Sequence, residues 1–254
     1  MEHWFPKKFT HKERLQIANK ILEVLKDRYK KSLVSVAIEG STAKGLDAPE
    51  SDLELRVLLD CDLDYHRWYA FFFEGMFVGI SYNSYFRTLE ESKEIDYEWS
   101  ISGDNLDTAI VIFDPSNVYD VLNQNNEFAE QRADFKKLIT ESVTDMYEHI
   151  YKVFTLSDND YISLNKEVTN IAYWAALTVG LANRVKYKSN KSMVEESFAL
   201  KNTPSNYEKN IRNLFLNENL FDIKNAVSVL WPSFVKWVSS EFEIDLSDDN
   251  LSFV

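Results

Sequence analysis

Cysteine, glycine and proline are scarce in this 254-residue chain, and each scarcity excludes a class of protein. The single cysteine, Cys61, has no partner for an internal disulfide and cannot form a cysteine-based zinc site. Six glycines and five prolines are too few for long flexible linkers or a collagen-like chain. No apolar run reaches the roughly 18–20 residues that cross a bilayer, and residues 1–20 carry scattered charges in place of a signal sequence. We therefore expect a cytoplasmic protein with no membrane partner.

Positive charge is also in short supply. The chain has 28 Lys and Arg against 41 Asp and Glu, which gives a net charge of −13 at pH 7. A surface this acidic repels a phosphate backbone, so the composition argues against nucleic acid as a partner. The rest of the composition, 45% hydrophobic and 27% charged, is typical of a globular protein with a buried core.

The residue patterns divide the chain near residue 120 into an α+β domain (1–120) and an all-helical domain (121–254). In the first domain, apolar residues at helical spacing predict a helix over 10–29. Alternating and β-branched runs predict strands over 32–39, 52–59, 65–73, 77–85 and 106–113, which form a mixed or antiparallel sheet. Glu74-Gly75 is typical of a hairpin turn. In the second domain we expect helices over 128–154, 167–186, 206–216 and 222–241.

The segment with the clearest chemistry lies between the first two predicted strands. Gly40 and Ser41 follow a strand, where they can turn tightly and present backbone N–H groups and a hydroxyl to a phosphate. Lys44 can reach the same phosphate as a point charge. Asp52 and Glu54 are two residues apart on a strand, so both carboxylates project from one face. Such a pair repels itself unless a cation lies between them, and oxygen ligands of this kind suit Mg²⁺.

These residues carry a resemblance to a known family. Gly40-Ser41 followed by Ser51-Asp52-x-Glu54 resembles the signature of the DNA polymerase β-type nucleotidyltransferases. The segments IEGSTAKGLDAPESDLEL and GLANRVKY, and a tail over 231–254 with a Trp-x5-Trp spacing and an aromatic penultimate residue, are similar to the aminoglycoside (kanamycin) nucleotidyltransferase family. The order of the domains, α+β and then helical, is also that of the family.

The resemblance implies a magnesium-dependent enzyme that moves AMP from ATP to a hydroxyl of a small molecule such as an aminoglycoside antibiotic, and that works as a homodimer. It assigns the metal to Asp52 and Glu54, and catalysis to these two acids together with Glu148. It implies a nucleotide site made by Gly40, Ser41, Lys44, Ser51 and Lys152.

The base of the family is a helix glutamate followed four residues later by a lysine that contacts the nucleotide. Glu148 and Lys152 have this spacing, which places both on one helix face. As the base, Glu148 accepts the proton of the attacking hydroxyl. A competing register selects Asp145 and His149 instead. We prefer Glu148, because its register preserves the lysine.

One departure from the family concerns the acceptor side. The family's third carboxylate falls on Gly79, and an acid of the preceding strand falls on Ala70. An aromatic-rich run over 68–77 replaces a polar, cation-binding wall. Two hypotheses follow: the enzyme uses a different, more apolar acceptor, or the protein is a nucleotide-binding or antitoxin-like relative with weak or no transferase activity. A protein hydroxyl as the acceptor is a third possibility.

Overall fold

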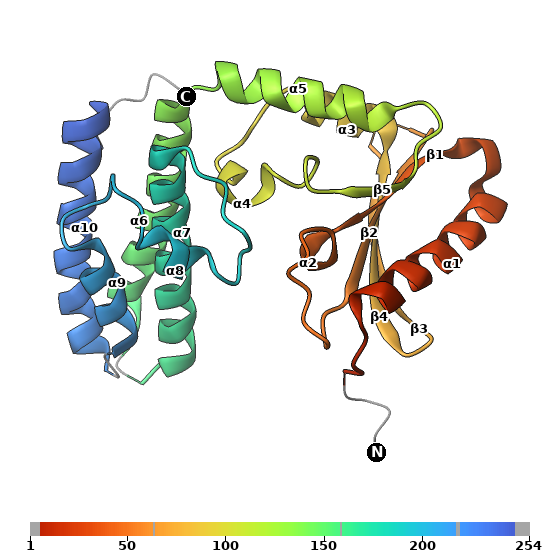
Figure 1. The fold of residues 1–254 in the computed structure, drawn as a ribbon. Coiled ribbons are helices and arrows are strands. Elements are labelled where there is room, and N and C mark those ends of the chain that lie inside the picture. Colours follow the sequence, from red (N-terminus) through yellow and green to blue (C-terminus); the bar gives the residue numbers. More distant parts are fainter. Residues whose placement is uncertain (1–5, 63, 158, 217–218, 247–254) are drawn as a thin grey trace. The chain divides into compact units, whose positions relative to one another are not determined.

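The structure is a computed structural model that describes residues 6–62, 64–157, 159–216 and 219–246 (Figure 1). The end of the tail, including the predicted aromatic penultimate position, lies outside these residues. Contacts divide the chain into two compact units. The first consists of the residues up to Ile95 together with Gly103–Ala133, and the second of Asp96–Ser102 together with the residues from Asp134 onward. Asp96–Ser102 thus belongs to the same unit as the residues from Asp134 onward, so the two units are not two consecutive stretches of the chain.

The first unit is built on a five-stranded mixed sheet. Its strands are β1 (Leu33–Glu39), β2 (Leu53–Leu59), β3 (His66–Phe73), β4 (Met76–Ser84) and β5 (Ile110–Phe113), in the order β3-β4-β2-β1-β5. The pair β2–β4 is parallel and the other pairs are antiparallel. A tight turn with positive φ at Glu74 and Gly75 joins β3 to β4. The α+β class was predicted correctly, and each predicted strand has a counterpart in this sheet.

Helix α1 (His11–Tyr29) covers one face of this sheet (Figure 1). Thr10 caps the helix in a reciprocal capping box with Glu13, which satisfies two backbone donors at the helix start. The apolar stripe of α1 packs on the alternate residues of β2 that begin with Leu53. The intervening residues of β2, Glu54 and Arg56, therefore project from the opposite face.

That opposite face is only partly covered by helices. Ala37 and Leu58 pack against α5 (Val118–Arg132), and α3 (Tyr85–Glu91) contributes partly buried residues to the same cluster. The polar residues of β1 and β2 lie nearer the end of the face where β1 ends and β2 begins. The sheet therefore combines an apolar core with a polar edge region.

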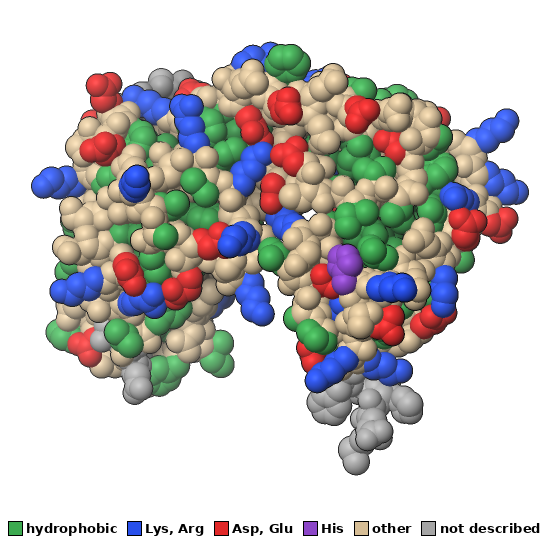
Figure 2. All heavy atoms as spheres, viewed as in Figure 1, with side chains coloured by type: hydrophobic (Ala, Val, Ile, Leu, Met, Phe, Trp, Pro, Cys, Tyr) green, Lys and Arg blue, Asp and Glu red, His purple; other side chains and the backbone are tan. Residues whose placement is uncertain are grey.

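The second unit is helical. It contains α4 (Trp99–Ser102), α6 (Phe135–Thr155), α7 (Tyr161–Asn183), α8 (Met193–Ser197), α9 (Tyr207–Leu216) and α10 (Leu220–Phe242). Helices α6 and α7 bury long apolar faces, and a hydrogen bond of 2.8 Å between the hydroxyls of Ser142 and Thr178 joins them. No helix within the described residues combines the length and apolar character needed to cross a bilayer. In the view of Figure 2, acidic and basic side chains are interspersed on both units.

Three secondary-structure predictions need correction. The predicted helix over 128–154 is two helices, α5 and α6, because Ala133 is extended and Asp134 caps α6 by accepting from the Lys137 amide. Strand β5 is shorter than predicted, because Thr108 bonds back to Asp104 in a turn. Residues 40–43, expected as a turn, form the short helix α2 (Gly40–Ala43).

Candidate active site

The turn after β1 is tightly packed against β2. Gly40 has a φ of +64°, a conformation that residues with a Cβ rarely adopt. A Cβ at this position would also overlap the Glu54 carboxylate. Gly40 is therefore required both by the backbone and by its neighbour. The turn continues into α2. Ser41, the residue after Gly40, is half-buried in this helix.

The two predicted metal ligands lie together at the start of β2. Glu54 pairs in register with Glu39 on β1. Burial raises the pKa of Glu54, and the negative charges of Asp52 and Glu39 raise it further. Within the part of the chain that the structure describes, neither Asp52 nor Glu54 has a hydrogen bond or ion pair. Two adjacent carboxylates thus lack a cationic partner, an arrangement that costs stability unless a cation binds.

Sequence reasoning missed a charged pair beside these ligands. Arg56 lies two residues after Glu54 on the same face, and its Nε is 2.7 Å from a carboxylate oxygen of Glu39. Burial raises the pKa of Glu39 although the Arg56 charge opposes this shift. The strand periodicity alone places Arg56 and Glu54 on one face, so this signal was available in the sequence. The partner of Arg56 depends on the pairing of β1 with β2, which the sequence does not show.

Lys44, the predicted phosphate ligand, lies in an ion pair. Its ammonium is 2.8 Å from a carboxylate oxygen of Asp104, and the two side chains are 12% and 17% exposed. Asp104 comes from the segment that precedes β5, so the sequence spacing gave no indication of this pair. The ammonium has three N–H donors, so a phosphate can bind to it beside Asp104 or in place of Asp104.

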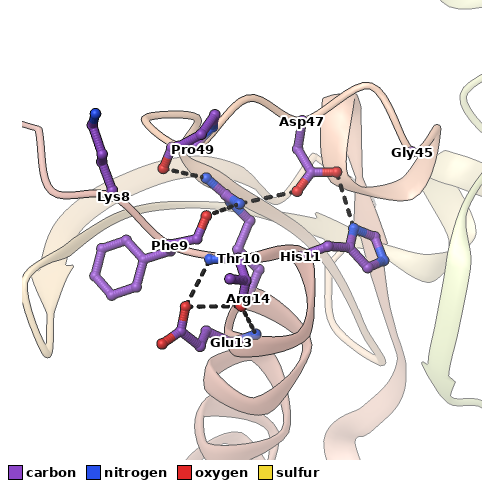
Figure 3. A pocket seen from close by; sticks show the side chains of 9 residues that line it. All are labelled: Lys8, Phe9, Thr10, His11, Glu13, Arg14, Gly45, Asp47 and Pro49. Atoms are coloured by element: carbon purple, nitrogen blue, oxygen red, sulfur yellow. Dashed lines mark hydrogen bonds and ion pairs between the residues drawn. The ribbon is translucent and has the colours of Figure 1, made fainter.

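Loop 45–51, which leads to Asp52, is held by a buried arginine. The Arg14 side chain is almost fully buried, and its guanidinium donates to the carbonyls of Ala48, Pro49 and Ser51 at 2.7–3.2 Å. It also donates to the Asp47 carboxylate at 2.9 Å. Figure 3 shows the guanidinium of α1 pointing into the loop from below.

The same loop explains the position of Ser51. The hydroxyl of Ser51 accepts a hydrogen bond of 3.0 Å from the Ala48 amide. The predicted nucleotide ligand Ser51 therefore helps to shape the loop. His11 adds a further contact at this place, with Nδ1 2.9 Å from the Asp47 carboxylate (Figure 3).

Gly79, where the sequence resemblance led us to expect a third carboxylate, pairs in register with Glu54 on one side and with Ala70 on the other. The indole of Trp68 lies over Gly79. Among the described residues, no group of three or more His, Cys, Asp and Glu side chains is arranged to hold a metal ion. A metal ion held by these two carboxylates would take its remaining ligands from water or from a substrate.

The second unit carries the predicted base. Glu148 and Lys152 lie on α6 as an ion pair of 2.6 Å, with side chains 61% and 42% exposed. The hydrogen bond from Lys152 lowers the pKa of Glu148. Asp145, on the same helix, behaves differently: burial and the charge of Glu148 raise its pKa, while His149 opposes them. The two registers thus offer carboxylates of opposite electrostatic character.

His149 belongs to a buried polar cluster that was not predicted. Its Nδ1 lies 2.6 Å from a carboxylate oxygen of Glu167 on α7 and 3.3 Å from the Asn170 side-chain nitrogen. The side chains of His149 and Glu167 are only 15% and 7% exposed. This pair joins α6 to α7 and fixes the orientation of the imidazole.

A Gly-Ser turn after one strand, two acids at the start of the next and a following helical unit are the features on which the prediction of a nucleotidyltransferase rested. The model of the family described as "KNTase C-terminal domain" matches residues 117–243, and the chain belongs to this family. The family and the enzyme class are those that the sequence predicted.

Two further comparisons cover most of the chain. The aminoglycoside nucleotidyltransferases (4') of Staphylococcus aureus and of a Bacillus species are each 19% identical over 245 residues, which span 94% of this chain and 95% of the relative. A nucleotidyltransferase-like protein from Exiguobacterium sibiricum 255-15 has the same fold, with a TM-score of 0.50 and 12% identity. That match covers 92% of this chain and 80% of the other.

Proposed function

We propose that this nucleotidyltransferase moves AMP from ATP to a hydroxyl of an aminoglycoside-type small molecule and so confers antibiotic resistance. The observation that carries the proposal is the pair Asp52 and Glu54, two adjacent carboxylates without a cationic partner in the described chain, packed against the Gly40-Ser41 turn. The names of the two curated relatives supply the acceptor class. The predicted homodimer stays a prediction.

The donor set fits Mg²⁺. Asp52 and Glu54 supply hard oxygen ligands. Burial and, to a smaller extent, the negative charges of Asp52 and Glu39 raise the pKa of Glu54, and a bound dication would offset both effects. When bound, Mg²⁺ would neutralise part of the triphosphate charge. Ser41 would donate its hydroxyl to the phosphates. The Lys44 ammonium would bind the same oxygens, beside Asp104 or in its place.

The proton of the acceptor hydroxyl needs a base. We assign the role of this base to Glu148. Its partner Lys152 would then contact the nucleotide instead of Glu148. The loss of that ion pair would bring the pKa of Glu148 back toward its ordinary value. Asp145 is the second candidate, because its raised pKa is better matched to a base at neutral pH.

The test is transfer itself. Purified protein with ATP, Mg²⁺ and a panel of aminoglycosides should release pyrophosphate and add one adenylyl group to the antibiotic, as detected by mass spectrometry. Asp52→Asn should lower kcat on the order of 10²–10³-fold. Asp62→Asn, which removes an exposed acid just after β2, is the matched control and should leave kcat unchanged. If Asp52→Asn binds MgATP with the affinity and magnesium dependence of the wild type, the metal assignment is wrong.

A second function is favoured by Gly79, which pairs in register with Glu54 at the position where the resemblance implied a third carboxylate. A protein with this site could bind MgATP without transferring AMP, in the manner of an antitoxin-like module. Isothermal titration with a non-hydrolysable ATP analogue separates the two functions. Tight Mg²⁺-dependent binding without transfer to any antibiotic or protein hydroxyl supports the module.

A further inference from the structure

The face of the sheet that carries Glu54 continues across β4 and β3 as an aromatic surface. We infer that the indole of Trp68 is the platform on which the ring of the acceptor lies. This inference rests on the proposed function, because it concerns the second substrate of the same reaction. It assigns to Trp68 the place that a third carboxylate would otherwise occupy.

The strand register places the indole next to the metal ligands. Glu54 pairs with Gly79, and Gly79 pairs with Ala70 on β3. Paired residues of neighbouring strands project from the same face, and Trp68 is two residues from Ala70, so Trp68 shares the face of Glu54. A Cβ at Gly79 would overlap Cη2 and Cζ2 of the indole. The ring therefore lies over Gly79, in the row that contains Glu54.

The ring is seated on one side and accessible on the other. Gly79 and Ala70 offer no side chain larger than a methyl group, which gives the indole room to lie against the sheet. The residue is nevertheless 52% exposed. Among the described residues, no aromatic ring and no cation stacks on it. Large exposed aromatic surface beside polar groups is characteristic of ligand sites.

The geometry of the displacement at phosphorus is consistent with an acceptor on the side of Gly79 and Trp68. In an in-line displacement, the attacking and the leaving oxygens lie on opposite sides of the phosphorus. In the sheet, β2 lies between β1, which leads to the Gly40-Ser41 turn, and β4, which carries Gly79. If pyrophosphate leaves on the Ser41 side, the hydroxyl attacks from the side of Gly79 and Trp68.

An indole selects a different ligand chemistry from a carboxylate. A carboxylate wall attracts ammonium groups by charge, and salt screens this attraction when the site is exposed. An aromatic face instead binds the C–H face of a saturated ring, and it binds ammonium groups through cation–π contacts. The acceptor class is therefore a hydroxyl-bearing saturated ring with one C–H-rich face, such as an aminosugar or aminocyclitol.

Steady-state kinetics with kanamycin and MgATP test the platform. Trp68→Ala should raise the KM for kanamycin about 10-fold and leave the KM for MgATP within about 2-fold. Trp68→Phe keeps an aromatic face and should stay within about 3-fold of the wild type. Tyr69→Ala is the matched control, because Tyr69 is 57% exposed, follows Trp68 and projects from the other face. Equal effects of Trp68→Ala and Tyr69→Ala would overturn the inference.

A binding readout separates this inference from the proposed function. Tryptophan fluorescence should change on addition of kanamycin to the wild type, and this change should be lost in Trp68→Phe. If the change occurs but AMP is never transferred, the proposed function fails and the platform stands. If AMP is transferred but the change persists in Trp68→Phe, the platform is overturned and the function stands. If kanamycin neither binds nor is modified, both are overturned.

Discussion

Carboxylates on β2 and on α6 have opposite surroundings. Asp52 and Glu54 lie side by side at the half-buried start of β2 with no cationic partner among the described residues, and the pKa of Glu54 is raised. Glu148 lies on an exposed helix surface beside Lys152, and its pKa is lowered. The comparison identifies the carboxylates at the start of β2 as charges that do not stabilise the fold. Such charges are candidates for binding, whereas a neutralised exposed pair contributes little to stability.

The largest effect is expected from the support of the β2 acids. Arg14→Met removes a buried guanidinium. Three loop carbonyls lose the guanidinium as a donor, and the Asp47 carboxylate keeps only its contact with His11. We expect unfolding free energy to fall by about 3–5 kcal/mol, because uncompensated buried polar groups are costly. Urea denaturation measures this loss. Arg28→Met, on the same helix but exposed, is the control and should change stability by less than about 0.5 kcal/mol.

An intermediate effect distinguishes the two registers of the base on α6. Glu148→Gln should lower kcat about 100-fold with little change in the KM for MgATP, because a general base acts in the transition state. Asp145→Asn should lower kcat by less than about 10-fold. Single-turnover AMP transfer measures both. A reversed order would assign the proton to Asp145 and would remove Glu148 from the catalytic residues.

The smallest effect concerns stability and tests the comparison directly. Because its pKa is raised in the folded state, ionised Glu54 destabilises the metal-free protein above that raised pKa, and the penalty disappears as pH falls below the ordinary carboxyl value. Glu54→Gln should therefore stabilise the protein at pH 7, by less than about 1 kcal/mol because solvent screens this partly exposed group, and should have no effect near pH 4. Thermal unfolding in the presence of a chelator measures this difference.

Substitution of Glu148, the carboxylate paired with Lys152, should change stability in the opposite direction. The lowered pKa of Glu148 means that its contribution to stability is present above the ordinary carboxyl pKa and is lost as pH falls through the lowered value. Glu148→Gln should thus be slightly less stable than the wild type at neutral pH. If both variants shift stability in the same direction at pH 7, the contrast between β2 and α6 is wrong.

Local patterns predicted the parts of the fold and site that depend on neighbours in sequence. The alternation of Asp52, Leu53 and Glu54 gives the strand and the shared face of the acids without further information. The boundary between α5 and α6 could not be predicted in this way, because the cap at Asp134 interrupts a continuous helical pattern. The roles of individual site residues stay predictions.

Contacts between segments that are distant in the sequence could not be predicted from it. The Arg56 partner depends on the register of β1 and β2, and the Lys44 partner lies 60 residues along the chain. The seat of Trp68 over Gly79 likewise depends on the pairing of β3 with β4. The sequence showed only that an acid was missing at Gly79. The structure shows the indole that lies there.

The Arg14 clamp has a consequence for variation among relatives of this chain. Three of its acceptors on loop 45–51 are backbone carbonyls, which every amino acid supplies. Side chains along most of this stretch can therefore drift with little penalty, whereas an insertion or deletion would move the carbonyls away from a donor with fixed planar geometry. We therefore expect the number of residues between the Gly40-Ser41 turn and Asp52 to vary less among relatives than the identities of those residues.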